Sequence, residues 1–165
     1  MSRLDSNIRR LVAQRACLDR AAALIRGREG VVFELGLGNG RTYDHLRENL
    51  PDRAIYVFEC LVTAHPDCVP AAEYLIVGDL RETLPRAAAR FRARVALLHL
   101  DTASSNRAAS ERLAAELAPH MAPLLRPGAV IASGLPLPGG SWHPLPLPSE
   151  VEEGRYYLYQ VPPAA

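Results

Sequence analysis

Five short runs of apolar, largely β-branched residues recur between residues 31 and 133, and longer amphipathic stretches separate them. An apolar run of this length, bounded by glycine, proline or aspartate, is typical of a strand buried on both faces. The predicted strands are 31–35, 54–59, 75–77, 95–100 and 129–133. Strands that alternate with helices need crossover connections, and such connections place the strands parallel. The sequence therefore predicts an α/β fold built on a doubly wound, mostly parallel sheet.

The helical stretches and the C-terminal part complete this organisation. Apolar residues recur at helical spacing in four long segments, which are 4–26, 42–50, 81–92 and 106–125. After residue 133 the chain becomes rich in proline and glycine, which excludes a regular helix or a central strand. A last alternating run covers 155–161. We expect one domain, with a helical cap (1–28), a core (29–133) and a proline-rich loop with abbreviated C-terminal strands (134–165).

Charge and cysteine content exclude several classes of partner. The 19 Lys and Arg residues nearly balance the 18 Asp and Glu residues, so nothing in the net charge of +1 favours nucleic acid or an acidic membrane as a partner. The three cysteines show no metal-type spacing, which indicates free thiols in a reducing compartment. The N-terminus has no apolar leader and no stretch is long enough to span a membrane. We therefore expect a cytoplasmic protein without a membrane partner.

Acidic residues close four successive predicted strands, and a glycine-rich turn follows the first. Ligands of an open parallel sheet gather beyond the carboxyl ends of its strands. The first end carries the segment 34–40, Glu-Leu-Gly-Leu-Gly-Asn-Gly, and the later ends carry Glu59, Asp79, and His99 with Asp101. Glycines let the backbone turn tightly and approach a ligand closely, and the next helix points its free N–H groups at that turn.

The spacing of these residues favours a nucleoside ligand without a pyrophosphate. Glu59 follows Gly40 by nineteen residues, where a carboxylate can accept both hydroxyls of a ribose. A dinucleotide fingerprint would need glycine or alanine at position 41 or 43, where Arg41 and Tyr43 stand instead. An NAD-dependent oxidoreductase is therefore the weaker alternative.

Residues 30–133 resemble the class I S-adenosylmethionine-dependent methyltransferases, which share a Rossmann-like methyltransferase fold. The segment 34–40 resembles their first motif, and Glu59 matches the acidic residue that binds the ribose diol in that family. Gly78-Asp79-Leu80 resembles the third-strand motif, whose Asp bonds the adenine amino group. The segments 99–101 and 124–131 resemble the motifs of the fourth and fifth strands. The resemblance implies S-adenosyl-L-methionine as cofactor, held by Glu34, Gly36, Leu37, Gly38, Asn39, Gly40, Thr42, Glu59, Cys60, Gly78, Asp79 and Leu80.

The catalytic and substrate residues are less clearly marked. His99 is a candidate general base, because a neutral imidazole can take a proton near pH 7; alternatively it is a hydrogen-bonded core residue. Asp101 is a candidate for substrate contact or a local turn former. Metal-dependent O-methyltransferases of this fold carry an Asp-Asn pair where this chain has Ser133 and Gly134, so no metal is expected. Trp142 and His143 could form a substrate wall after the fifth strand, or Trp142 could simply pack on the core.

The sequence thus predicts a methyltransferase that acts on a small-molecule acceptor mainly through proximity and orientation. A non-catalytic cofactor-binding or regulatory protein on the same fold is the alternative, because fold does not fix function. We also expect a homo-oligomer, since the short C-terminal part leaves apolar surface uncovered.

Overall fold

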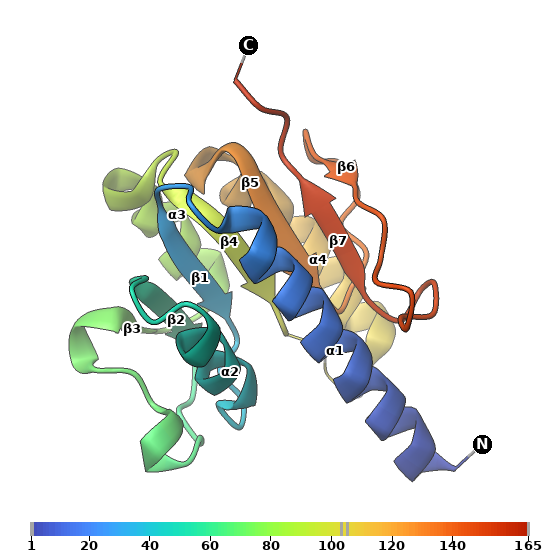
Figure 1. Cartoon of the computed structure of the whole chain (residues 1–165). Helices are drawn as coiled ribbons and strands as arrows, with labels where there is room; N and C mark the ends of the chain where they lie inside the picture. Colours follow the sequence, from blue (N-terminus) through green and yellow to red (C-terminus); the bar gives the residue numbers. More distant parts are fainter. Residues whose placement is uncertain (1, 103, 105, 165) are drawn as a thin grey trace.

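A seven-stranded sheet forms the centre of the computed structural model, which describes residues 2–102, 104 and 106–164 (Figure 1). The strands are β1 (Val31–Leu35), β2 (Ile55–Glu59), β3 (Leu75–Val77), β4 (Val95–Leu100), β5 (Leu125–Ser133), β6 (His143–Pro144) and β7 (Tyr157–Gln160). The helices are α1 (Arg3–Ile25), α2 (Arg41–Asn49), α3 (Leu80–Phe91) and α4 (Arg107–Met121), with short 3₁₀ turns η1 (Pro66–Cys68), η2 (Ala72–Tyr74) and η3 (Ala122–Leu124).

The strand order is β3-β2-β1-β4-β5-β7-β6. Strands β1 to β5 pair in parallel, whereas β7 runs antiparallel to β5 and β6 antiparallel to β7. The order reverses between β1 and β4, which creates the switch point where ligands of such sheets bind. The expected doubly wound, mostly parallel α/β fold with abbreviated C-terminal strands is confirmed, since β7 has four residues and β6 only two.

Helices cover both faces of the sheet. Figure 1 shows α1 and α2 in front of the strands and α3 and α4 behind them. Each face carries its own hydrophobic core, one centred on Phe33, Phe58 and Leu98 towards α3 and α4, the other on Val32, Val57 and Leu97 towards α1 and α2. All six residues of β4 are buried, as expected for a central parallel strand.

Two boundaries differ from the sequence prediction by four residues. The fourth helix was predicted to reach residue 125, but α4 ends at Met121 and β5 begins already at Leu125. Val95 pairs with Leu125 while Leu97 pairs with Val130, so three extra residues bulge out of β5 around Gly128, whose φ is +75°. A bulge leaves the extra residues of one strand unpaired and disrupts the hydrogen-bond ladder only locally. Pairing with β4 can therefore begin at Leu125, before the apolar run of β5. The two-residue strand β6 was not predicted, because it is too short to show a period.

Within the described residues, no helix combines the length and the apolar character that crossing a bilayer requires.

Candidate functional site

A cavity of about 340 Å³ opens at the carboxyl ends of β1 to β4. Its lining includes six of the residues predicted to bind a cofactor, which are Gly36, Gly38, Glu59, Cys60, Asp79 and Leu80. Five lining residues were not singled out as cofactor ligands, namely Phe58, Arg81, Asp101, Thr102 and Leu113. The cavity therefore spans four strand ends in spatial order, from β3 through β2 and β1 to β4.

The glycine turn after β1 is packed too closely for side chains at two positions. Gly36 has φ +95°, and a Cβ there would lie 2.5 Å from the carbonyl oxygen of Asp101. Gly40 has φ +78°, and a Cβ there would lie 2.4 Å from the Cβ of Cys68. By contrast, the space around Gly38 is open, although its φ is +51°. The turn is thus wedged between the end of β4 and the η1 segment.

Glu59 holds the turn from the neighbouring strand. Its Oε2 accepts hydrogen bonds from the backbone N–H groups of Leu37 (2.8 Å) and Gly38 (3.0 Å). Its Oε1 accepts from the N–H groups of Cys60 (2.8 Å) and Leu61 (3.3 Å). Burial raises the pKa of this carboxyl, but the four N–H donors outweigh burial and hold the pKa below its ordinary value. Glu59 is therefore a fixed negative charge beside the cavity.

Asp79 caps α3 at the far end of the cavity. Its carboxylate accepts a hydrogen bond from the N–H of Arg81 at 2.8 Å, and this local bond starts the helix. The guanidinium of Arg81 lies 3.6 Å from Asp79 and donates to Glu116 at 2.9 Å. The side chain of Asp79 stays 53% exposed, so it can still meet a ligand.

A chain of buried polar side chains runs beneath the turn, from α2 to the end of β4. Thr42 donates to one oxygen of Glu34, and Nδ1 of His99 lies 2.6 Å from the other. Nε2 of His99 lies 2.5 Å from the hydroxyl of Tyr156. Gln14 then bridges Tyr156, at 3.4 Å, to the carboxylate of Asp101, at 2.8 Å. The chain links Asp101 at the cavity to Glu34 and His99, which have no exposed surface.

His99 is completely buried within this chain. Both ring nitrogens have partners, and the residue lines neither this cavity nor any other described one. Burial lowers its pKa, but the charge and hydrogen bond of Glu34, with the charge of Asp101, outweigh burial and raise the pKa above its ordinary value. Burial raises the pKa of Tyr156 well above its ordinary value, so that hydroxyl keeps its proton. The geometry thus matches the core alternative for His99.

The other predicted cofactor residues lie outside the lining of the cavity. Leu37 and Thr42 are buried, and Leu37 packs in the core beneath α1 and α2. Gly40 is also buried, Asn39 is exposed, and Gly78 precedes the Asp79 cap.

Trp142 and His143 do not lie beside the carboxyl end of β5, where the sequence placed them. His143 pairs with Gln160, and Gln160 pairs with Val130, three residues before the end of β5. The chain folds back along β7, so His143 lies level with the middle of β5. Trp142 is 7% exposed and its indole N–H donates to the carbonyl of Leu137 at 3.1 Å. The geometry thus matches the core-packing alternative for Trp142, while the exposed His143 lies on the edge strand β6.

Sequence reasoning missed Gln14 and Tyr156 as parts of the site. Gln14 lies in an amphipathic helix and is separated from Asp101 by 87 residues, so no local pattern could connect them. Tyr156 lies beside two other tyrosines, and nothing in that run marks one as a partner of His99. Thr102 directly follows Asp101 and could have been found from that position alone.

No three His, Cys, Asp or Glu side chains in the described part of the chain gather in a way that could hold a metal ion. The cavity offers backbone N–H groups as hydrogen-bond donors and three carboxylates, those of Glu59, Asp79 and Asp101, as acceptors, which suit a polar organic ligand.

The chain is similar to known methyltransferases. Residues 1–161 match the family described as S-adenosyl-L-methionine methyltransferase. The S-adenosyl-L-methionine methyl transferase from Silicibacter pomeroyi DSS-3 is 45% identical, with a TM-score of 0.93 over 97% of this chain and 98% of that chain. A comparison with curated proteins gives no significant match.

More distant structures share the fold alone. The antibiotic-resistance methyltransferase Kmr has a TM-score of 0.53 at 15% identity, over 86% of this chain and 91% of that chain. The 1,6-didemethyltoxoflavin-N1-methyltransferase from Burkholderia thailandensis has a TM-score of 0.50 at 18% identity, over 88% of this chain and 76% of that chain.

Proposed function

Because this chain belongs to the S-adenosyl-L-methionine methyltransferase family, we propose that it binds this cofactor in the 340 Å³ cavity and methylates a small-molecule acceptor. The observation that carries the proposed site is that the Glu59 carboxylate is held by the glycine turn and lines the same cavity as Asp79 and Asp101. When bound, the cofactor supplies an activated methyl group.

The order of strand ends supports one orientation of the cofactor. Asp79 and Leu80 would hold the adenine, and Glu59 the ribose hydroxyls. A carboxylate offers about four acceptor positions. Four N–H groups and the thiol of Cys60 already donate to Glu59, so the two ribose hydroxyls would take the places of the two longest bonds, those from the Cys60 thiol at 3.4 Å and the Leu61 N–H at 3.3 Å. Gly36 and Asp101, at the opposite end of the cavity, would then border the methionine part.

Four predicted ligands take a supporting role in this proposal. Glu34 and Thr42 bond one another beneath the turn, while Leu37 and Gly40 pack against the core and η1. They would shape the turn rather than touch the cofactor.

The protein's contribution to methyl transfer is orientation in this proposal. His99 has no exposed surface, so it would fix Glu34 and Tyr156 in place rather than take a proton from the acceptor. Asp101 is half-buried, lines the cavity and is held by Gln14, so it is the carboxylate best placed to meet the acceptor. Holding two reactants in line can lower a barrier by about 7–11 kcal/mol without acid–base chemistry.

Calorimetry tests the cofactor site. Wild-type protein should bind S-adenosylhomocysteine and S-adenosylmethionine, and NAD should give no heat. Glu59→Ala should weaken binding at least about tenfold, since it removes a charge-assisted acceptor. Glu48→Ala is the control, because it removes an exposed carboxylate on α2 that forms no ion pair within the described residues. Equal affinities of the two variants, or binding of NAD alone, would contradict the proposed site.

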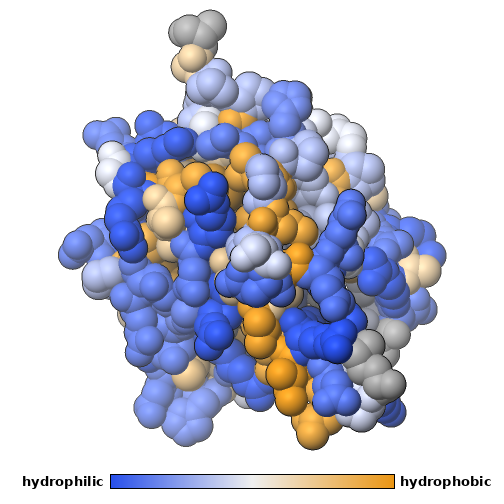
Figure 2. Space-filling model, turned by 45° about the vertical axis from the view of Figure 1, so that its right-hand side comes forward, coloured by the Kyte–Doolittle hydropathy of each residue, from blue (hydrophilic) through white to orange (hydrophobic). Residues whose placement is uncertain are grey.

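We also propose that the protein self-associates through α1. Three hydrophobic residues one turn apart on this helix remain exposed, which are Leu4 (68%), Ile8 (51%) and Leu11 (38%). Figure 2 shows hydrophobic side chains gathered in a stripe down one face of the molecule. A contiguous apolar surface of this kind is typical of protein–protein contacts.

A further inference from the structure

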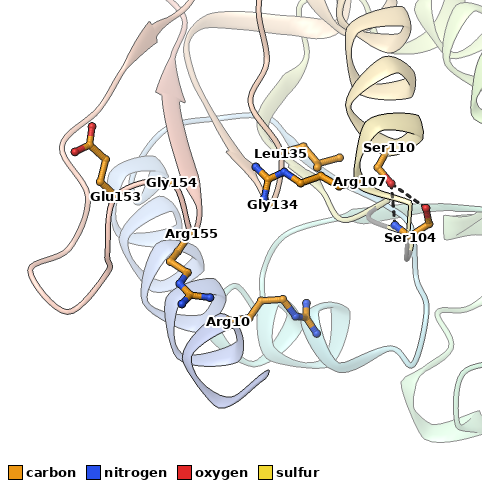
Figure 3. A pocket seen from close by; sticks show the side chains of 9 residues that line it. All are labelled: Arg10, Ser104, Arg107, Ser110, Gly134, Leu135, Glu153, Gly154 and Arg155. Carbon is orange, nitrogen blue, oxygen red and sulfur yellow. Dashed lines mark hydrogen bonds between the residues drawn. The ribbon is translucent and has the colours of Figure 1, made fainter. Parts of the chain in front are cut away.

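A second cavity, of about 400 Å³, lies next to the proposed cofactor site (Figure 3). Three arginines line it, and they come from separate parts of the chain: Arg10 from α1, Arg107 from the first turn of α4, and Arg155 from the segment before β7. Every basic residue other than histidine in this chain is an arginine, and the net charge is only +1. Three guanidinium groups around one cavity therefore concentrate positive charge locally.

Carboxylates near the cavity offset only part of this charge. Arg107 pairs with Glu111 at 2.7 Å and Arg155 with Glu152 at 3.1 Å. Among the residues that the structure describes, Arg10 forms no ion pair. Glu153 also lines the cavity, but Figure 3 shows its carboxylate pointing away from the guanidinium groups of Arg10 and Arg155. Glu152 also pairs with Arg9, at 3.0 Å, so it is shared between two guanidinium groups. Arg10 therefore brings to the cavity a positive charge that no carboxylate of the described residues pairs with.

The start of α4 adds further donors to the same wall. Arg107 is the first residue of this 15-residue helix, so the positive end of the helix dipole faces the cavity. The hydroxyls of Ser104 and Ser110 lie 3.0 Å apart on the same side, and both donate to the carbonyl oxygen of Asn106. Guanidinium groups and a helix N-terminus are together a typical environment for an oxyanion.

The two cavities share the connection between β4 and α4. Asp101 and Thr102 line the proposed cofactor cavity, whereas Ser104 lines the arginine cavity. On α4, Leu113 borders the first cavity and Ser110, about one turn earlier, borders the second. Gly134, at the end of β5, hydrogen bonds to Leu100 and also lines the arginine cavity. The arginine cavity thus lies at the carboxyl end of β5. It adjoins the end of β4, where the methionine part of the cofactor is proposed to lie.

We propose that the arginine cavity binds the methyl acceptor and that this acceptor carries an anionic group, a carboxylate or a phosphate. The proposal rests on the function proposed above. The paired N–H donors of a guanidinium group match the geometry of both oxyanions. Three such groups from separate parts of the chain would fix the orientation of the acceptor. The acceptor's nucleophilic atom would then point across the β4–α4 connection towards the methyl group, and the anionic group would stay unmodified.

Anion binding is tested without knowledge of the natural acceptor. Protein loaded with S-adenosylhomocysteine is titrated with sodium phosphate and, separately, with sodium benzoate at constant ionic strength. The ¹⁵N Nε–Hε signals of Arg10, Arg107 and Arg155 should shift and saturate with at least one anion. The anion that binds more tightly shows whether the acceptor's anionic group is a phosphate or a carboxylate. The signal of Arg20, exposed elsewhere on α1, should not follow them. Failure of both anions to produce saturable shifts at the three arginines would overturn the proposal.

Matched variants assign the binding to the cavity. Arg10→Gln and Arg155→Gln should each raise the dissociation constant of the tighter anion about tenfold, the loss expected for one charge-assisted contact. Arg20→Gln removes the same charge from the same helix and should change it less than about twofold. Equal effects of all three variants would indicate a general charge effect and overturn the proposal.

Cofactor binding separates this proposal from the one on which it rests. Affinity for S-adenosylhomocysteine should be the same in Arg10→Gln as in wild type, because Arg10 lies outside the cofactor cavity. If the wild type binds no S-adenosylhomocysteine, the proposed function fails, and the same titrations of unloaded protein still decide whether the arginines bind an anion.

Discussion

At the scale of single residues, Glu34 and His99 form a buried polar pair in the centre of the sheet. Both side chains are fully buried, and Nδ1 of His99 lies 2.6 Å from Oε2 of Glu34. Their remaining polar atoms are partnered by Thr42 and Tyr156. Removing one partner of such a pair costs about 3–5 kcal/mol, because the other charge stays buried and uncompensated. The site above the pair therefore rests on a polar network that tolerates little change.

His99 should make stability fall as pH rises. Its pKa in the folded state is raised, chiefly by Glu34 against the opposing effect of burial. The ordinary value is about 6.5, so this stabilisation is fully present below about pH 6.5 and is lost as pH rises through the raised pKa. Urea unfolding between pH 6 and 10 should show the decline. His99→Gln should cost about 3 kcal/mol at pH 6 and remove the decline.

His120→Gln provides the comparison for this effect, since His120 is exposed near the end of α4. It should keep both the stability and the pH dependence of the wild type. A decline of equal size in His99→Gln would show that other groups cause it.

At the scale of secondary-structure elements, the turn between β1 and α2 couples the cofactor cavity to β4. Gly36 lies against the backbone of Asp101, and the N–H of Asp101 donates to the carbonyl of Leu35 at 3.0 Å. The turn, the end of β4 and the β4–α4 connection therefore form one wall. A change that displaces Gly36 should move Asp101 as well.

Alanine at positions 36 and 38 should have unequal effects. Both glycines have positive φ, which costs a residue with a Cβ about 1–2 kcal/mol. Gly38→Ala should cost only this amount, because the space around its Cβ is open. Gly36→Ala should cost at least about 3 kcal/mol, since its Cβ would also overlap the carbonyl oxygen of Asp101. Chemical unfolding of both variants measures the difference, and equal losses would contradict the close packing described here.

At the scale of the whole molecule, two helical layers protect the sheet but leave one face of α1 uncovered. The buried side of α1 packs on the sheet through residues such as Cys17, Leu18 and Ile25, while hydrophobic side chains on its N-terminal turns are exposed. Figure 2 shows hydrophobic side chains in a stripe on one face of the molecule. A stripe of this kind on a small protein favours self-association, because association removes the apolar surface from water.

Light scattering should therefore give a mass above the 18.0 kDa of one chain. Ile8→Glu should return the protein to the monomer, since it places a charge in the stripe. Leu61→Glu is the control, because Leu61 is 70% exposed but lies outside α1. Both variants should keep the wild-type circular dichroism. A monomeric mass for the wild type would overturn the proposed association.

The sequence by itself determined six of the seven strands, the order of elements and the cluster of acidic and glycine residues at the strand ends. These features follow from local demands. An apolar run must be buried on both faces of a parallel sheet, and a turn with positive φ needs glycine, as at Gly36. Parallel strands also bring their carboxyl ends together, so the sequence alone places Glu59 and Asp79 near that turn.

Only the tertiary structure decided which side chains meet. It paired Gln14 with Asp101 and Tyr156 with His99, it moved Trp142 into the core, and it gathered the three arginines around one cavity. Each of these outcomes depends on how helices pack on the sheet or on the register of an antiparallel edge strand. Packing and register are set by contacts between residues far apart in the chain, and no local pattern records them.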